Sequence, residues 1–272
     1  MVLRSFVISA LLAAPAVPAA AQPLAPTSKW TVNFADSQCI AVRAYGTATD
    51  PLRFVLKAPP LGGVMQIAVI RPAPRMTRAE QADLTVGVDE RPPLKTSLLM
   101  YTPKGAKERV YLLNMPAEEF ARVREARKLT LRSPALNQTF ALSQMAPLLK
   151  VMQDCVEDLR RVWNVSPLEG GTPPNLTRRA QGDLSRYFSD GDYPAAAISK
   201  SLSGRVRFAL LVGEDGKVAD CTVIETSGVA VLDGQACALV MQRAKFQPAL
   251  GTDGKPAKDA LIAAIMWKMR EY

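Results

Sequence analysis

The residue pattern of the last eighty or so positions constrains the fold of this chain more than any other feature of the sequence. Apolar periodicity and turn residues predict five elements in a fixed order: a short helix, two strands, a second helix and a last strand. They are expected at residues 193–202, 204–213, 218–226, 234–244 and 260–269. Gly216 stands in the tight turn between the first two strands, where a positive φ favours glycine. This region is therefore predicted to be an α+β domain that contains a hairpin.

The second helix and the last strand of this region can be described further. Asp233 is predicted to cap the helix at residues 234–244 by accepting a free backbone N–H, while Leu232 packs back onto that helix. Alternation along the last strand places five apolar residues on a single face: Leu261, Ala263, Ile265, Trp267 and Met269. Either this face or the opposite one is expected to be core.

The first half of the chain is predicted to be a β-rich α+β domain over residues 28–164. Short apolar runs separated by Pro, Gly and Asp predict its strands. These are expected at residues 30–45, read as strand, turn and strand, and at 52–58, 63–70, 82–88, 97–101, 109–114 and 128–131. Helices are predicted at residues 116–126 and 143–163, the second from its apolar spacing of three and four residues. Residues 165–192, rich in Pro, Gly, Asn and charge, are predicted to be a linker.

Residues 1–21 have the order of a cleavable secretory signal. Arg4 supplies an early charge, an apolar run follows, and small residues lead up to Ala21. The apolar run is shorter than the ~20 residues that a membrane-spanning helix needs. We therefore expect cleavage of this signal peptide and export of the protein from the cytoplasm. The alternative is an uncleaved segment that anchors the protein in the inner membrane.

Four cysteines remain after the predicted cleavage: Cys39, Cys155, Cys221 and Cys237. An oxidising compartment favours disulfides over free thiols, and four cysteines allow three connectivities. The sequence does not choose among them, although one bridge in each domain is the simplest arrangement. Cys155 lies on the apolar stripe of the helix at residues 143–163. From this position alone we expect it to meet Cys39 at an early strand.

The absence of histidine narrows the chemistry open to this chain of 272 residues. It excludes Ser/His and Cys/His catalysis and histidine-ligated metals. The acid pairs Glu118-Glu119 and Glu214-Asp215, and the run Ser199-Lys200-Ser201, lack the spacing of a catalytic motif. We expect no enzymatic activity, no metal and no other cofactor.

The formal net charge of +9 is concentrated in the first domain. Residues 28–164 hold 20 Lys and Arg against 13 Asp and Glu, whereas residues 193–272 hold 10 against 8. A basic surface attracts anionic partners. One alternative function is therefore that of a structural envelope protein that binds peptidoglycan or anionic lipid through this domain. Nucleic acid is not expected as a partner in the periplasm.

Several motifs stand in register over the last eighty residues. They are Tyr193-Pro194, Gly204 with Val206, Gly216 with Val218, Ser227-Gly228, Leu232-Asp233, Ala236, Phe246-Gln-Pro248-Ala249 and Gly254 with Pro256. Through this combination, residues 193–272 resemble the C-terminal domain of TonB-type energy transducers. The first half is similar, in Cys39, Tyr45-Gly46, Phe140-Ala-Leu-Ser143 and Cys155, to a β-rich domain that precedes TonB-like domains in some exported proteins. The whole chain is thus expected to be a two-domain α+β protein with a C-terminal α-β-β-α-β domain.

The resemblance implies a way of binding partners. In the transducer family, an extended peptide of an outer-membrane receptor adds as a strand beside the last strand of the domain. The candidate edge here carries Leu261, Ala263, Ile265, Trp267 and Met269. The resemblance also fits a bridge between Cys221 and Cys237, because the helix packs on the hairpin. Exchange of the last strand between two chains would give a homodimer.

Energy transducers also carry an N-terminal membrane helix and a long Pro-rich spacer. We expect neither here, because the first segment is predicted to be cleaved. The resemblance then favours a periplasmic binding or adaptor module related to TonB-dependent transport across the outer membrane. A true energy transducer is the alternative if the N-terminal segment is an uncleaved anchor.

Overall fold

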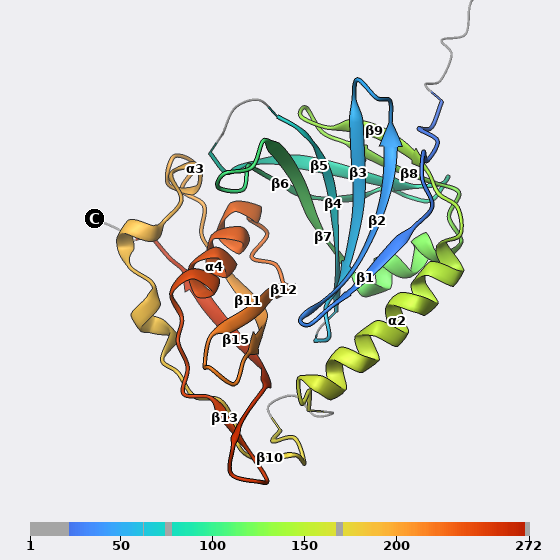
Figure 1. Ribbon diagram of the computed structural model, residues 1–272. Helices are drawn as coiled ribbons and strands as arrows, with labels where there is room; N and C mark the ends of the chain where they lie inside the picture. The colour runs from blue at the N-terminus through green and yellow to red at the C-terminus, as the bar shows by residue number, and fades with distance from the viewer. Residues whose placement is uncertain (1–21, 62, 74–77, 167–170, 270–272) are drawn as a thin grey trace, which may run out of the picture.

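Nine antiparallel strands form one sheet in the N-terminal half of the computed structural model (Figure 1). The structure describes residues 22–61, 63–73, 78–166 and 171–269, so the predicted signal peptide lies outside the described residues. The sheet order is β1-β2-β3-β4-β7-β6-β5-β8-β9. The strands are β1 (Thr31–Ala35), β2 (Gln38–Gly46), β3 (Pro51–Ala58), β4 (Val64–Pro72), β5 (Glu80–Val88), β6 (Leu94–Tyr101), β7 (Glu108–Pro116), β8 (Lys128–Arg132) and β9 (Asn137–Ala141). The apolar pattern predicts the first eight of these and misses β9, which begins with two polar residues.

The two ends of this curled sheet are joined by the segment that enters it. Leu24 accepts a hydrogen bond from the backbone N–H of Ala141 at 2.9 Å and donates its own to the carbonyl of Thr139 at 2.7 Å. Three residues later, the N–H of Thr27 donates to the carbonyl of Ala44 at 2.9 Å. The entering segment therefore bonds both to β9, at one end of the sheet, and to β2, next to the other.

The inner face of the sheet holds an aromatic core. Tyr45, Phe54 and Phe140 are almost completely buried, and neighbouring ring centroids lie 5.0–6.1 Å apart in tilted and edge-to-face arrangements. Such geometries are the favourable ones for aromatic pairs. The buried guanidinium of Arg43 donates to the carbonyl oxygens of Ser28 and Ser143 at 2.9 Å, so its charge is hydrogen-bonded.

One long helix, α2 (Met145–Val162), packs against the same core. Its buried residues follow the predicted spacing: Met145, Leu148, Met152, Cys155 and Leu159. Cys155 is bonded to Cys39 of β2, which ties the helix to the sheet. The other predicted helix is shorter than expected: α1 (Ala117–Phe120) gives way to the 3₁₀ turn η1 (Ala121–Glu125).

The C-terminal domain has the predicted order of elements, so the chain is a two-domain α+β protein. A three-stranded sheet, β12-β11-β15, is formed by β11 (Gly204–Val212), β12 (Val218–Glu225) and β15 (Asp259–Trp267). Helix α4 (Ala230–Arg243) packs on one face, and the short α3 (Ala195–Ile198) precedes β11.

Helix α4 begins four residues earlier than the sequence pattern predicts. Asp233 is not a residue before the helix but lies within its first turn. Its carboxylate reaches back to the preceding loop and accepts hydrogen bonds from the backbone N–H of Ser227 at 2.9 Å and from the hydroxyls of Ser227 and Thr226. The start of the helix is thus stabilised by a side chain that lies inside the helix. Because capping residues usually precede a helix, the sequence pattern places the start of α4 too late.

Much of the segment predicted to be a linker is packed on the C-terminal domain. Strand β10 (Leu176–Arg178) forms a small sheet with β13 (Ala249–Gly251) and β14 (Pro256–Ala257). Two 3₁₀ turns follow, η2 (Leu184–Tyr187) and η3 (Asp190–Asp192). The segment lacks apolar periodicity because it is attached by irregularly spaced apolar residues, such as Leu176, Ala180 and Phe188, together with a few charged residues described below. Residues 167–170 of the predicted linker lie outside the described residues.

Candidate functional site

Strand β15 forms one edge of the C-terminal sheet. It pairs with β11 along its whole length, from Gly204 opposite Trp267 to Val212 opposite Asp259. In the part of the chain that the structure describes, no strand pairs with its other side. An unpaired edge offers N–H and C=O groups to a further strand.

The groups that face this open side can be identified from one contact. The guanidinium of Arg179 donates to the carbonyl of Ala260 at 2.6 Å, so the main chain of Ala260 faces away from β11. Because successive residues of an antiparallel strand turn their main-chain groups to alternate sides, Ile262, Ala264 and Met266 also face outward. The main-chain groups of Leu261, Ala263 and Ile265 face β11 instead.

The five candidate partner-binding residues differ in their position relative to the core and to the end of β15. Leu261, Ala263, Ile265 and Trp267 point to the core beneath α4, and Met269 follows the end of the strand. The first three are only half-buried, since the edge of the sheet extends beyond the cover of the helix. On the opposite face, Met266 is 60% exposed.

Both ends of β15 are held by the segment that precedes α3. At the start, the fully buried Asp259 accepts hydrogen bonds from Arg179 Nε and from the backbone N–H of Ala180. At the end, the ring of Trp267 lies edge-on to Phe188 and Tyr193, with centroids 5.9 and 5.3 Å away. The strand is therefore fixed at both ends by side-chain contacts.

A second ion pair attaches the same segment to α4. Arg243 binds Asp192 through two hydrogen bonds of 2.8 and 2.7 Å, and Ser189 donates to the same carboxylate. Chiefly through the hydrogen bonds from Arg243, the pKa of Asp192 is lowered to about 2.

The pKa of Asp233 is shifted in the opposite direction. Burial of its carboxyl raises the pKa, and this effect exceeds the lowering by the hydrogen bonds from Ser227 and Thr226.

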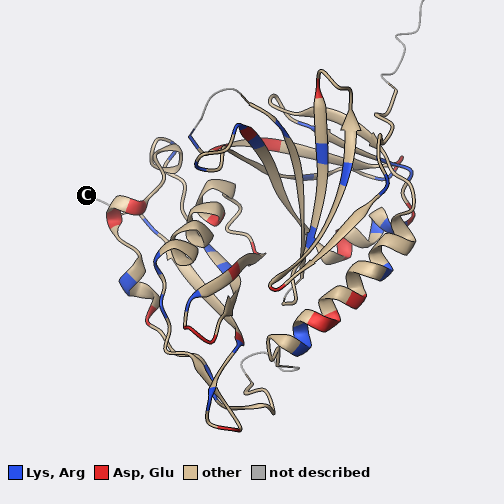
Figure 2. Cartoon of the chain, viewed as in Figure 1, with Lys and Arg blue, Asp and Glu red and all other residues tan. Residues whose placement is uncertain are grey.

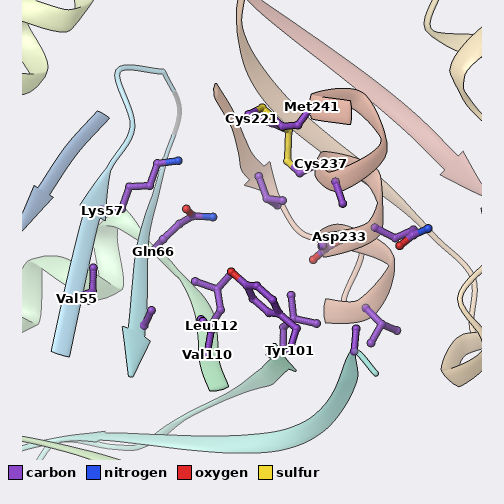
Figure 3. Close-up of a pocket in the computed structure, with 18 of the residues that line it drawn as sticks. Val55, Lys57, Gln66, Tyr101, Val110, Leu112, Cys221, Asp233, Cys237 and Met241 are labelled. Atoms are coloured by element: carbon purple, nitrogen blue, oxygen red, sulfur yellow. A yellow bond between two sulfur atoms is a disulfide. The ribbon is translucent and has the colours of Figure 1, made fainter. Parts of the chain in front are cut away.

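A cavity of about 490 Å³ lies between the two domains (Figure 3). Its floor is the outer face of the N-terminal sheet, and its opposite wall is β12 and α4. The wall includes the disulfide between Cys221 and Cys237, which ties β12 to α4. Most lining residues are aliphatic, and the principal polar ones are Lys57, Gln66, Tyr101, Asp233 and Gln235.

No sequence motif marks this cavity, but the apolar pattern of three strands indicates that both faces of the N-terminal sheet are covered. Strands β4, β6 and β7 contain nearly continuous apolar runs where a strand with one solvated face would alternate. Such runs indicate strands covered on both faces. The second cover is here supplied by the C-terminal domain.

Other kinds of site find no support among the described residues. No cluster of three or more His, Cys, Asp or Glu side chains that could hold a metal ion occurs there. The helices of the same residues include none that is long and apolar enough to cross a membrane.

The fold and the strand order together define an α+β domain with an open sheet edge at β15. Residues 190–269 match the family model of the Gram-negative bacterial TonB protein C-terminal. The chain therefore carries a C-terminal TonB domain, as the resemblance in the sequence implies. Domains of this family are non-enzymatic and interact with outer-membrane receptors and envelope proteins. A comparison with curated proteins found no match.

Proposed function

We propose that the protein is a periplasmic adaptor that binds an extended segment of an outer-membrane receptor, or of another envelope protein, beside β15. The observation that carries this proposal is the open edge at Ile262, Ala264 and Met266. Main-chain bonds to these three residues would extend the sheet by one strand, and such bonds give affinity with little dependence on sequence.

Side chains beside the edge would supply selectivity. The half-buried Leu261, Ala263 and Ile265 leave apolar surface next to the position of an added strand. On the other face, the exposed Arg205 of β11 lies opposite Met266 in the register. We therefore expect the bound segment to alternate apolar residues on the α4 side with polar residues, including an acidic one near Arg205.

Two features support a periplasmic location. Both disulfides, Cys39 with Cys155 and Cys221 with Cys237, suit an oxidising compartment. The order of residues 1–21 is that of a cleavable signal. Removal of the signal would give a periplasmic adaptor, whereas an uncleaved anchor would favour a true energy transducer. Sequencing the N-terminus of the protein isolated from the envelope distinguishes the two.

The alternative, a structural protein that binds peptidoglycan or anionic lipid through basic residues, has weaker support. Basic side chains of the N-terminal sheet are interspersed with acidic ones (Figure 2). Several are engaged in ion pairs: Arg53 with Glu108, Arg71 with Asp50, Arg109 with Glu80, and Lys128 with Glu90. Paired charges attract a polyanion less than free ones do.

A pair of proline substitutions tests the adaptor proposal. Ala264→Pro removes an N–H that faces outward, which an edge strand tolerates, whereas Ala263→Pro removes one that faces β11. We expect Ala264→Pro to remain folded but to lose capture of envelope partners in pull-downs with the purified protein. Ala263→Pro should lower the midpoint of thermal unfolding. If Ala264→Pro is folded and captures the same partners as the unmodified protein, the proposed edge is wrong.

A further inference from the structure

The floor of the interdomain cavity is divided into a polar and an apolar part. Strand register places Lys57 of β3, Gln66 of β4 and Asn114 of β7 in one row across the sheet. The next row is wholly aliphatic: Val55, Ala68, Leu112 and Leu99. Figure 3 shows Lys57 and Gln66 extending toward the C-terminal domain, away from the end of the cavity marked by Val110 and Tyr101.

The facing wall continues the apolar part. Val223 of β12 and Val231, Ala238 and Met241 of α4 line it. Met241 is 42% exposed, although it is a large apolar side chain. The cavity is therefore a cleft with aliphatic surface on both sides and a hydrogen-bonding row at one end, while Tyr101, Asp233 and Gln235 are polar side chains elsewhere in its lining. Its volume falls in the ~300–1,000 Å³ range typical of small-molecule sites.

The backbone around the cavity argues against a peptide as its occupant. Strands β3, β4, β7 and β6 are interior strands with a neighbour on each side. Their main-chain groups are used within the sheet, and those of α4 within the helix. An extended peptide in this cleft could pair its N–H and C=O groups only along β12, which is an edge strand, and the groups on its other side would stay buried and unpaired, which is unfavourable. An alkyl chain has no such groups.

The polar end offers hydrogen bonds without a net charge. Lys57 Nζ lies 2.6 Å from Asp220 Oδ1, so the two charges compensate each other. An ammonium has three donors, and Asp220 takes one of them. The amide of Gln66 lies beside Lys57 and donates to Asn114 at 3.1 Å. A head group rich in acceptor oxygens suits this end whether or not it is charged overall.

We propose that the interdomain cavity binds one single-chain lipid, with its acyl chain between the aliphatic row of the sheet and α4 and its head group at Lys57 and Gln66. The occupant is a monoacyl chain because the aliphatic row of the floor faces the aliphatic side chains of α4, and neither the floor nor α4 offers main-chain partners. This site is separate from the edge of β15, so either proposal can fail without the other.

Binding is tested with dodecanoate and with a twelve-carbon lysophosphatidylcholine, both below their critical micelle concentrations. We expect each to bind the purified protein at one site in isothermal titration calorimetry, and the comparison of the two shows which head group is preferred. Ala238→Phe fills the cleft from an exposed position of α4 and should weaken both ligands about tenfold or more. Ala121→Phe, at an exposed position of η1, is the matched control and should leave binding unchanged.

A second variant tests the placement of the head group. Gln66→Leu should weaken lipid binding roughly threefold to tenfold. A lipid with a shorter acyl chain should lose the same factor of affinity in this variant as in the unmodified protein, because Gln66 contacts only the head group. Ala68→Phe, on the sheet side, replaces Ala238→Phe if the latter does not fold. Absence of saturable binding by both lipids, equal affinity in a folded cleft-filling variant, or binding of an amphipathic helical peptide but of neither lipid would overturn the proposal.

Discussion

Lys57 and Asp220 connect the two domains through an ion pair of 2.6 Å between Nζ and Oδ1. The side chains are 15% and 5% exposed. Asp220 also accepts hydrogen bonds from the amide of Gln38 at 3.0 Å and from the hydroxyl of Thr222 at 3.1 Å. One carboxylate of β12 is thus held by two strands of the other domain, beside the polar end of the cleft.

Removing the carboxylate of Asp220 should destabilise the contact between the two domains and lower the free energy of unfolding. We expect Asp220→Ala to lower the free energy of unfolding by about 2–4 kcal/mol, because Lys57 is left with a largely buried and unpaired charge. Glu108→Ala is the control: it breaks an ion pair with Arg53 on the same strand, but that pair is about half exposed and is worth at most ~1 kcal/mol. Urea denaturation of both variants measures the difference, and equal effects would contradict a special role for Asp220.

The two disulfides should contribute unequally to stability. Cys39 and Cys155 are separated by 116 positions and Cys221 and Cys237 by 16. In the chain-entropy model, loops of these lengths correspond to about 4–5 and about 3 kcal/mol. Guanidinium unfolding of the two double Cys→Ala variants should therefore show the larger loss for the Cys39–Cys155 pair. A larger loss for the other pair would show that native-state packing dominates over loop closure.

Two glycines in similar turns should respond differently to alanine. Gly216 has a φ of +77°, and an added Cβ would lie 2.1 Å from the carbonyl oxygen of Phe246. Gly254 has a φ of +76°, but nothing lies within 4 Å of its added Cβ. We expect Gly216→Ala to cost about 3 kcal/mol or more and Gly254→Ala about 1 kcal/mol, because only the first adds a backbone clash to the unfavourable φ. Thermal unfolding midpoints of the two variants measure this difference.

The ion pair of Asp192 should give the C-terminal domain an acid dependence. Its pKa in the folded protein, about 2, lies below the ordinary value of 3.8, so the stabilisation is complete above pH 3.8 and is lost as pH falls toward 2. Because Arg243 is 41% exposed, we expect only about 1–2 kcal/mol from this pair. The difference in unfolding free energy between the unmodified protein and Asp192→Asn should be largest near pH 6 and shrink by pH 3. A difference that does not change over this range would exclude the pair as its source.

The fold follows from the sequence to a large extent because its strands and helices are marked by local periodicity. The stripe of α2 and the hairpin around Gly216 are examples, since their apolar spacing and turn residue are read directly from the chain. The start of α4 is not marked in this way, because Asp233 acts from inside the helix on a loop six residues earlier.

The sites are less predictable, because they depend on contacts between distant segments. Alternation along the last strand divides its side chains into two faces correctly, but the outward main-chain groups become clear only from the contact of Arg179 with Ala260. The attachment of the predicted linker rests on single ion pairs such as Arg243 with Asp192 and on irregularly spaced apolar residues such as Phe188. The cleft requires both domains, and no local pattern specifies which surface covers the apolar rows of the first.

The bonds of Leu24 to Thr139 and Ala141 bear on how the protein reaches its native state. The sheet can close only after more than a hundred further residues have been synthesised, and such distant pairing makes folding slow because a long loop must be ordered first. A slowly folding chain stays unfolded for longer, which suits passage through a translocation channel that admits only unfolded polypeptide. The topology of the first domain therefore delays closure of its sheet until the chain has been made as far as Ala141, and in a protein that is exported such a delay favours delivery across the membrane over rapid collapse at the site of synthesis.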